Sequence, residues 1–209
     1  MTGTIFLSTA ILLNADEPSR RWIQSQHSST NDRLAEIGTN YGREVYGFAL
    51  SVGLYAGGMI AMKDDIRETG LLLFESIAFA TTISTAGKYL IGRSRPFEGE
   101  GQTRFRGLQS TYSRTSFPSG HSTVAFAVSS ILAERIDKPV VTLGLYSLAA
   151  ITALSRIYND QHWFSDTFAG AVIGTACGLA VAELHHRQPG RQTVTIMPTL
   201  NGIRTEIRF

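Results

Sequence analysis

Residues 118–154, PSGHSTVAFAVSSILAERIDKPVVTLGLYSLAAITAL, decide how the chain folds. Two apolar runs, Ser122–Ala133 and Val140–Leu154, are separated by a short segment with four charged residues and Pro139. Pro139 suits the first turn of a helix because its fixed φ matches the helix and its missing N–H has no partner to lose there. This stretch therefore predicts two helices joined by a tight polar turn.

Further apolar runs lie on both sides of this pair and are connected by polar segments. They are Thr4–Leu13, Val45–Met62, Leu71–Ile91 and Thr167–Leu184. Almost nothing before residue 192 alternates with the period of two that a half-buried strand shows. We therefore predict one all-α domain over residues 1–192, a bundle of six helices.

The composition agrees with a single folded domain. The length of 209 residues is typical of one domain, and 43% hydrophobic with 17% charged residues excludes intrinsic disorder. A net charge of +2 is too small to argue for nucleic-acid binding. The lone cysteine, Cys177, lies in an apolar run and is predicted to be a small core residue.

The sequence leaves open whether the helices cross a membrane. The uncharged run Val45–Met62 approaches the roughly 20 apolar residues that a span requires, but the mean hydropathy is only +0.02. Glu75, near the middle of the third helix, would be costly in a bilayer unless it faced the protein interior. Lys and Arg are spread evenly over both ends of a six-span arrangement, so no orientation emerges.

The N-terminal run Ile5–Leu13 is either an export or anchor segment or the first core helix. No basic residue precedes it, which favours a core helix.

The C-terminal residues 193–209 differ from the rest of the chain. Thr193–Leu200 and Ile203–Phe209 flank Asn201-Gly202, a strong signal for a two-residue hairpin turn. We predict a short β-hairpin appendage whose apolar face docks on the helical body. The apolar pairs expected across the turn are Leu200 with Ile203, Ile196 with Ile207, and Val194 with Phe209.

Three short motifs carry groups suited to phosphate chemistry. Lys88 and Arg95 are seven residues apart, two helical turns, so they should project from one side of a helix that Pro96 ends. Pro118-Ser119-Gly120-His121 should open a helix, whose free N–H groups and close backbone approach suit an anion.

The third motif begins with Ser155-Arg156 and continues to His162 and Asp166. The spacing of four places the Asp166 carboxylate beside the His162 imidazole on one helical face, where it fixes the tautomer. Each motif alone would also fit an ordinary helix end. Together they offer three cations, two histidines and a carboxylate, a set that can clamp and transfer a phosphoryl group.

In this order and spacing, the motifs Lys88-x6-Arg95-Pro96, Pro118-Ser119-Gly120-His121 and Ser155-Arg156-x5-His162-x3-Asp166 resemble the signatures of a known superfamily. It is the type 2 phosphatidic acid phosphatase (PAP2) and vanadium haloperoxidase superfamily, and the motif core covers residues 88–166. The resemblance implies a helical-bundle phosphatase that needs neither metal nor another cofactor.

The resemblance also implies a role for each matching residue. His162 would form a phosphohistidine, Asp166 would be its hydrogen-bond partner, and His121 would be the general acid. The phosphate-binding groups would be Lys88, Arg95, Ser119, Gly120 and Arg156.

A lipid phosphate such as phosphatidate or a polyprenyl diphosphate is the expected substrate. The protein would lie in a bacterial-type cell envelope, embedded in or apposed to the membrane, with its site facing away from the cytoplasm. The alternatives are a soluble acid phosphatase of the envelope, a vanadate-dependent haloperoxidase and a non-catalytic phosphate-binding module. The loop Phe97–Phe117 holds three arginines that could receive a second phosphate: Arg104, Arg106 and Arg114.

Overall fold

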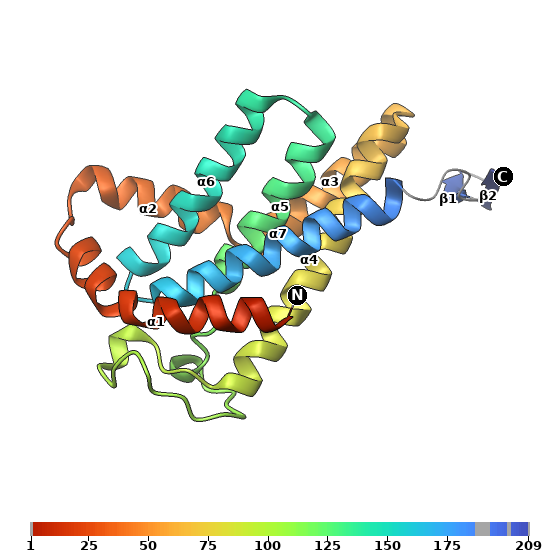
Figure 1. Ribbon diagram of the computed structural model, residues 1–209. Helices are drawn as coiled ribbons and strands as arrows, with labels where there is room; N and C mark the ends of the chain where they lie inside the picture. Colours follow the sequence, from red (N-terminus) through yellow and green to blue (C-terminus); the bar gives the residue numbers. More distant parts are fainter. Residues whose placement is uncertain (1, 187–192, 200–201, 209) are drawn as a thin grey trace.

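In the part of the chain that the structure describes, seven α-helices form the body, and α5 packs against α4, α6 and α7 (Figure 1). The computed structural model describes the backbone of residues 2–186, 193–199 and 202–208 and the side chains of residues 13–186. The helices are α1 (Thr2–Gln24), α2 (Ser29–Tyr41), α3 (Glu44–Ala61), α4 (Asp64–Ile91), α5 (Gly120–Ile136), α6 (Pro139–Tyr158) and α7 (Phe164–His186). The connection between α4 and α5 contains two short 3₁₀ turns, η1 (Pro96–Glu98) and η2 (Tyr112–Arg114).

The count of six helices was wrong because α2 escapes a search for apolar runs. α2 is mostly polar, and only Ala35 and Gly38 are buried in it. Its start is nevertheless encoded locally, since the Ser28 hydroxyl accepts the Asn31 N–H in an N-cap. Gly38 lets α2 lie directly on α6, where a Cβ at this position would stand 2.8 Å from the Ile151 carbonyl oxygen.

Glycines also bring α5 and α7 into backbone contact. Gly170, Gly174 and Gly178 lie four residues apart on one face of α7. A Cβ at Gly170 would be 2.5 Å from the Ser119 carbonyl oxygen, and one at Gly174 would overlap the Thr123 carbonyl oxygen. Because no side chain separates the two helices here, their starts lie close together.

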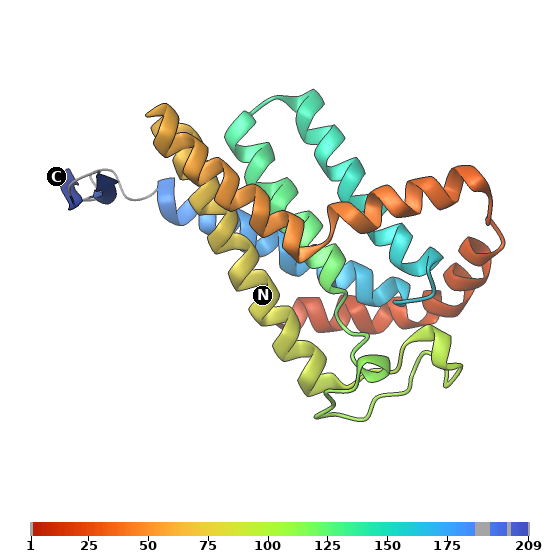
Figure 2. The same ribbon diagram turned by 180° about the vertical axis from the view of Figure 1, so that it is seen from behind.

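The alternating direction of the helices gathers four helix ends at one end of the bundle. α4 and α6 end there, α5 and α7 begin there, and the long connection of residues 92–119 covers this end (Figures 1 and 2). Behind it, a buried apolar cluster joins α4, α5 and α7; its members are Leu72, Leu73, Ile77, Val124, Val128, Ile131, Val181 and Ala182.

Large apolar side chains lie exposed on the outer surface of the bundle. Four helices, α3, α4, α6 and α7, are long and apolar enough to cross a membrane, and 17–44% of their most apolar windows is buried within the protein. Glu75, the charge that argued against a span, lies with its carboxylate 3.5 Å from His185 Nε2 of α7. A partnered, partly buried carboxylate is far less costly in a bilayer than an isolated one.

Two antiparallel strands follow the helices, β1 (Thr193–Thr199) and β2 (Gly202–Arg208). The register pairs Val194 with Ile207 and Thr199 with Gly202. The partner of each residue is therefore shifted by two positions from the prediction, which paired Val194 with Phe209. Gly202 therefore belongs to the second strand, where it pairs with Thr199. The predicted docking of this hairpin on the helical body lies outside the described residues. The same holds for the side chains of residues 5–12, so the predicted role of the N-terminal apolar run stays a prediction.

Candidate active site

The end of α4 places the first two cations in different ways. Lys88 lies in the last turn of α4, and its Nζ donates to the carbonyl oxygens of Thr115 (3.1 Å) and Pro118 (2.5 Å). Gly92, at φ 59°, then ends the helix, and a Cβ there would lie 2.8 Å from the Gly107 nitrogen. The helical-spacing argument for Arg95 was therefore wrong, because Arg95 follows the helix in extended backbone.

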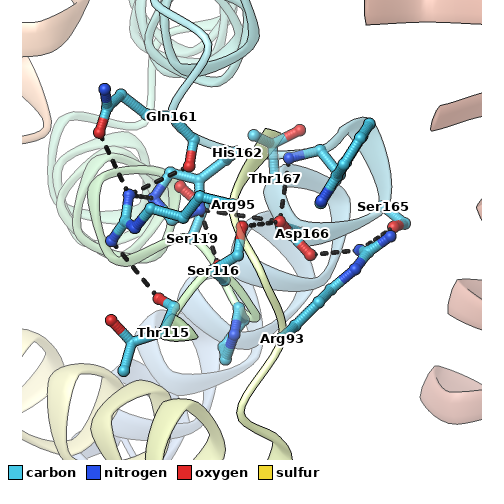
Figure 3. Close-up of polar contacts among 12 residues, drawn as sticks. Arg93, Arg95, Thr115, Ser116, Ser119, Gln161, His162, Ser165, Asp166 and Thr167 are labelled. Atoms are coloured by element: carbon cyan, nitrogen blue, oxygen red, sulfur yellow. Dashed lines mark hydrogen bonds and ion pairs between the residues drawn. The ribbon is translucent and has the colours of Figure 1, made fainter. Parts of the chain in front are cut away.

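Arg95 reaches the site through contacts with two loops. Its Nε donates to the Tyr112 carbonyl oxygen (2.8 Å), and its guanidinium carbon lies 4.0 Å from the centre of the Tyr112 ring. One terminal nitrogen donates to the Gln161 carbonyl oxygen (3.0 Å) and lies 3.3 Å from Nε2 of His162 (Figure 3). The side chain is buried, so its charge faces the histidine with little solvent between them.

The second motif opens α5 as predicted, with Ser119 as the N-cap and Gly120 as the first helical residue. The Ser119 hydroxyl caps no backbone N–H, while its own N–H donates to the Asp166 carbonyl oxygen (3.0 Å) and so ties α5 to α7. A Cβ at Gly120 would lie 3.7 Å from Cε of Lys88, which shows how closely the backbone approaches that cation. The start of α5 thus combines free N–H groups with a neighbouring positive charge.

Arg156 completes the cation set from the last turn of α6. It is buried, and one terminal nitrogen donates to the Thr39 hydroxyl of α2 (3.2 Å). Its buried Nε finds no hydrogen-bond partner among the described residues. A buried N–H group without a hydrogen-bond partner destabilises the folded protein unless a ligand accepts its hydrogen bond. Arg156 is therefore suited to bind an anion.

His162 lies just before the start of α7, and its imidazole does not pair directly with Asp166 as the sequence predicted. Its Nδ1 lies 2.7 Å from the Ser116 carbonyl oxygen and 3.8 Å from the Asp166 carboxylate. A carbonyl can only accept, so Nδ1 carries the proton and Nε2 keeps the free electron pair. The predicted direct bond from His162 to Asp166 is absent in this geometry, since the two residues do not lie on one regular helical turn.

Asp166 instead contacts Ser116, whose carbonyl oxygen in turn accepts Nδ1–H of His162. One carboxylate oxygen accepts the Ser116 hydroxyl (2.5 Å) and the Trp163 N–H (2.9 Å), and the other accepts Arg93 (2.5 Å). Ser116 and Arg93 were missed by sequence reasoning. Their only signal was proximity to the motifs, because Ser116 lies two residues before Pro118 and Arg93 two before Arg95.

The electrostatics of the site favour neutral histidines. Burial, then the charges of Arg156, Lys88 and further arginines, lower the pKa of His121 to about 3. Burial also holds the pKa of His162 well below its usual value, and Lys88 and Arg95 act in the same direction. A bound phosphate dianion would offset these cations and raise both pKa values.

The loop arginines bond mainly within their own loop. Arg106 donates to Glu100 (2.5 Å), and Arg114 donates to the Gln109 side chain (3.2 Å). Their role toward a second phosphate stays a prediction. In the part of the chain that the structure describes, no group of three or more His, Cys, Asp or Glu side chains could hold a metal ion.

Comparison with known proteins places this arrangement in a class. The profile of the PAP2 superfamily matches residues 69–189, more than half of the chain and all three motifs. The chain therefore belongs to the PAP2 superfamily, whose phosphatases are phosphoric ester hydrolases.

The chain is similar to several phosphatases within this superfamily. A lipid A 1-phosphatase of Porphyromonas gingivalis is 36% identical over 109 residues, which cover 50% of this chain but only 22% of that protein. An undecaprenyl-diphosphatase of Sulfolobus acidocaldarius is 26% identical over 72% of this chain and 69% of its own length. The crystal structure of a transmembrane PAP2-type phosphatidylglycerolphosphate phosphatase from Bacillus subtilis shares the fold, with a TM-score of 0.69 at 24% identity over 89% of this chain and 96% of that one. This chain has four helices, α3, α4, α6 and α7, that are long and apolar enough to cross a membrane.

Proposed function

We propose that this PAP2-type protein hydrolyses a lipid phosphate or diphosphate through a phosphohistidine formed on Nε2 of His162. The observation that supports this proposal most directly is the orientation of His162. Its Nδ1 proton is committed to the Ser116 carbonyl oxygen, and its unprotonated Nε2 lies 3.3 Å from a terminal nitrogen of Arg95. The buried Arg156 Nε has no partner among the described residues, and the start of α5 supplies N–H groups for the same anion.

In the first step, Nε2 of His162 attacks the phosphorus atom while the bond from phosphorus to the leaving oxygen breaks. His121, protonated once the dianion is bound, gives its proton to that oxygen. Lys88, Arg95 and Arg156 stabilise the charge on the transferring phosphoryl oxygens. The positive charge that develops on the His162 ring is balanced through the Ser116 carbonyl and the nearby Asp166 carboxylate.

In the second step, water attacks the phosphorus atom and the bond from phosphorus to Nε2 breaks. His121, now neutral, accepts a proton from the water, so that inorganic phosphate leaves and both histidines return to their initial states. A monoester yields an alcohol and phosphate, and a diphosphate yields a monophosphate and phosphate.

The apolar exterior supports a lipid as the substrate. The site lies where four helices end, and α4 and α6, which carry Lys88 and Arg156, are both candidate membrane spans. Phosphate-binding groups at the end of such helices would meet a lipid headgroup at the membrane surface. The names of the relatives, a lipid A phosphatase and a polyprenyl diphosphatase, agree with this class.

The test compares phosphate release from phosphatidate, a polyprenyl diphosphate and a soluble aryl phosphate, in detergent with EDTA. We expect release that prefers a lipid and falls about 1,000-fold or more in His162→Ala, since the nucleophile is lost. His186→Ala, which removes a half-exposed histidine of α7 paired with Glu134, should keep the parental rate.

Other outcomes would replace the proposal. Full activity in His162→Ala would exclude the phosphohistidine. Preference for the aryl phosphate would favour an acid phosphatase without a lipid substrate. Halide oxidation that depends on vanadate and peroxide would identify a haloperoxidase, and phosphate binding without release would identify a binding module.

A further inference from the structure

A charged network lies behind the site, and none of the three motifs includes its centre. Arg93 is fully buried between two carboxylates, Asp166 of α7 and Asp16 of α1. Its terminal nitrogens lie 2.5 Å from Asp166 and 2.6 Å from Asp16 (Figure 3 shows the Asp166 side). Both acids are also fully buried, so each charge depends on the others for compensation.

Asp16 is bonded to the start of α7 as well as to Arg93. One of its carboxylate oxygens accepts the backbone N–H of Ser165 (2.7 Å), and the other accepts the Ser165 hydroxyl (2.7 Å). The same hydroxyl oxygen accepts a hydrogen bond from a terminal nitrogen of Arg93 (2.7 Å). Asp16 thus holds, from a separate helix, both the residue next to Asp166 and the guanidinium that Asp166 binds.

These contacts continue to the reacting imidazole. Asp166 accepts the Ser116 hydroxyl, and the Ser116 carbonyl accepts Nδ1–H of His162. The network therefore runs without a gap from Asp16 through Arg93, Asp166 and Ser116 to His162. Every member is buried, so a polar group left unpaired anywhere along it would disturb its neighbours.

We propose that Asp16 is a positioning residue for the His162–Ser116–Asp166 group, a role that rests on the function proposed above. It fixes Arg93 and the first turn of α7, and these in turn fix the Asp166 carboxylate. The N-terminal helix is accordingly part of the active-site support. Asp16 touches no substrate, so its loss should slow the reaction while leaving substrate affinity nearly unchanged.

The test is Asp16→Asn, which keeps the size of the side chain but turns an N–H₂ group toward Arg93 or Ser165. Glu17→Gln is the matched control, because it makes the same change one residue further along, at a partly exposed side chain paired only loosely with Arg20 (3.8 Å). Ser165→Ala is a milder second variant that removes only the bridging hydroxyl. Active sites are counted by vanadate-binding stoichiometry, so that misfolded protein does not enter the rate.

We expect kcat per vanadate-binding site to fall about 10-fold or more in Asp16→Asn, as is typical when an orienting partner is lost. The KM of Asp16→Asn should change less than about twofold. The kcat per site of Ser165→Ala should fall by a smaller factor, and that of Glu17→Gln should equal the parental value. Parental kcat per site in Asp16→Asn overturns the proposal. If that variant does not fold, parental kcat per site in Ser165→Ala overturns it instead.

A second readout does not depend on turnover. The Nδ1–H of His162 should give a protected imidazole NMR signal, because its proton is buried against the Ser116 carbonyl. We expect faster exchange of this proton in Asp16→Asn and no change in Glu17→Gln. If the parent protein hydrolyses none of the esters, only the proposed function is refuted. If the exchange rate of the His162 Nδ1 proton is the same in Asp16→Asn as in the parent, the positioning role of Asp16 is refuted.

Discussion

The charge of His121 depends on what the site contains. It is neutral at pH 7, because burial and the neighbouring cations lower its pKa to about 3. The proposed acid step requires the protonated form. The substrate dianion would supply the missing negative charge, so the proton should enter together with the substrate rather than before it.

This coupling predicts that a non-titrating dianion binds more tightly as the pH falls. The pKa of His121 is low in the empty site and higher with an anion bound, so binding takes up a proton. Affinity for sulfate should therefore rise between pH 8 and pH 5, where sulfate itself does not titrate. Calorimetry in buffers of different ionisation enthalpy measures both the affinity and the proton uptake.

His121→Asn should remove most of this proton uptake, because His162 has to stay unprotonated at Nε2 to act as the nucleophile. His186→Asn, a change at a half-exposed histidine, should leave it intact. Sulfate affinity independent of pH in the parent protein would contradict the assigned role of His121.

At the level of residues, the motifs marked eight positions for the site, and the structure brings all eight to the same end of the bundle. Their catalytic and binding roles stay predictions. The local geometry could not be derived from spacing, because Gly92 ends α4 before Arg95 and because α7 starts after His162. Asp16 was out of reach for a different reason: its partner Ser165 lies 149 residues away, and only the fold brings them together.

At the level of elements, the glycine face of α7 sets how closely α5 can approach. A methyl group at position 174 would overlap the Thr123 carbonyl oxygen of α5, and backbone cannot move aside as a flexible side chain can. The helices would have to separate, and the start of α5 carries His121.

Gly174→Ala is therefore expected to destabilise the protein by about 1–3 kcal/mol, the usual cost of overpacking. It should also lower kcat, because His121 moves relative to His162. Denaturant unfolding in detergent and phosphate release measure the two effects. Gly144→Ala on α6 is the control, since no atom lies within 4 Å of a Cβ there.

We expect Gly144→Ala to be neutral or to stabilise by up to about 1 kcal/mol, since alanine is the better helix former. A Gly174→Ala protein as stable and active as the parent would show that the two helices are not held by this contact.

Most helices could be predicted from the sequence because their apolar runs are long, and α6 begins at Pro139 as expected. α2 could not be found in this way because it offers α6 small residues rather than a broad apolar stripe. The register of the two strands was also missed, because the Asn201-Gly202 signal is local, whereas the observed register pairs Val194 with Ile207 rather than Phe209.

At the level of the whole molecule, the order of the helices separates two ends. Residues 92–119 and 159–163 lie at the site end, whereas residues 62–63 and 137–138 join helices at the opposite end (Figures 1 and 2). With α3, α4, α6 and α7 spanning a bilayer, these two ends would lie on opposite sides of the membrane.

This separation predicts the labelling of single cysteines. In a Cys177→Ser background, Glu98→Cys should react with an impermeant thiol reagent added outside intact cells, and Lys63→Cys should react only after the membrane is opened. The proposed orientation, with the site facing away from the cytoplasm, is the reason for this order. The reverse pattern would invert the orientation, and equal labelling of both positions in intact cells would contradict a spanning arrangement.

The bond from the Ser119 N–H to the Asp166 carbonyl oxygen joins two helix starts through backbone atoms alone. Exchange of either side chain leaves that bond in place, and only a proline at position 119 would remove the donor. The distance between the anion-binding turn and the nucleophile is therefore insulated from most point mutations. A lineage could rebuild the surrounding loops and lipid-facing surfaces for a new substrate while inheriting the reaction centre unchanged.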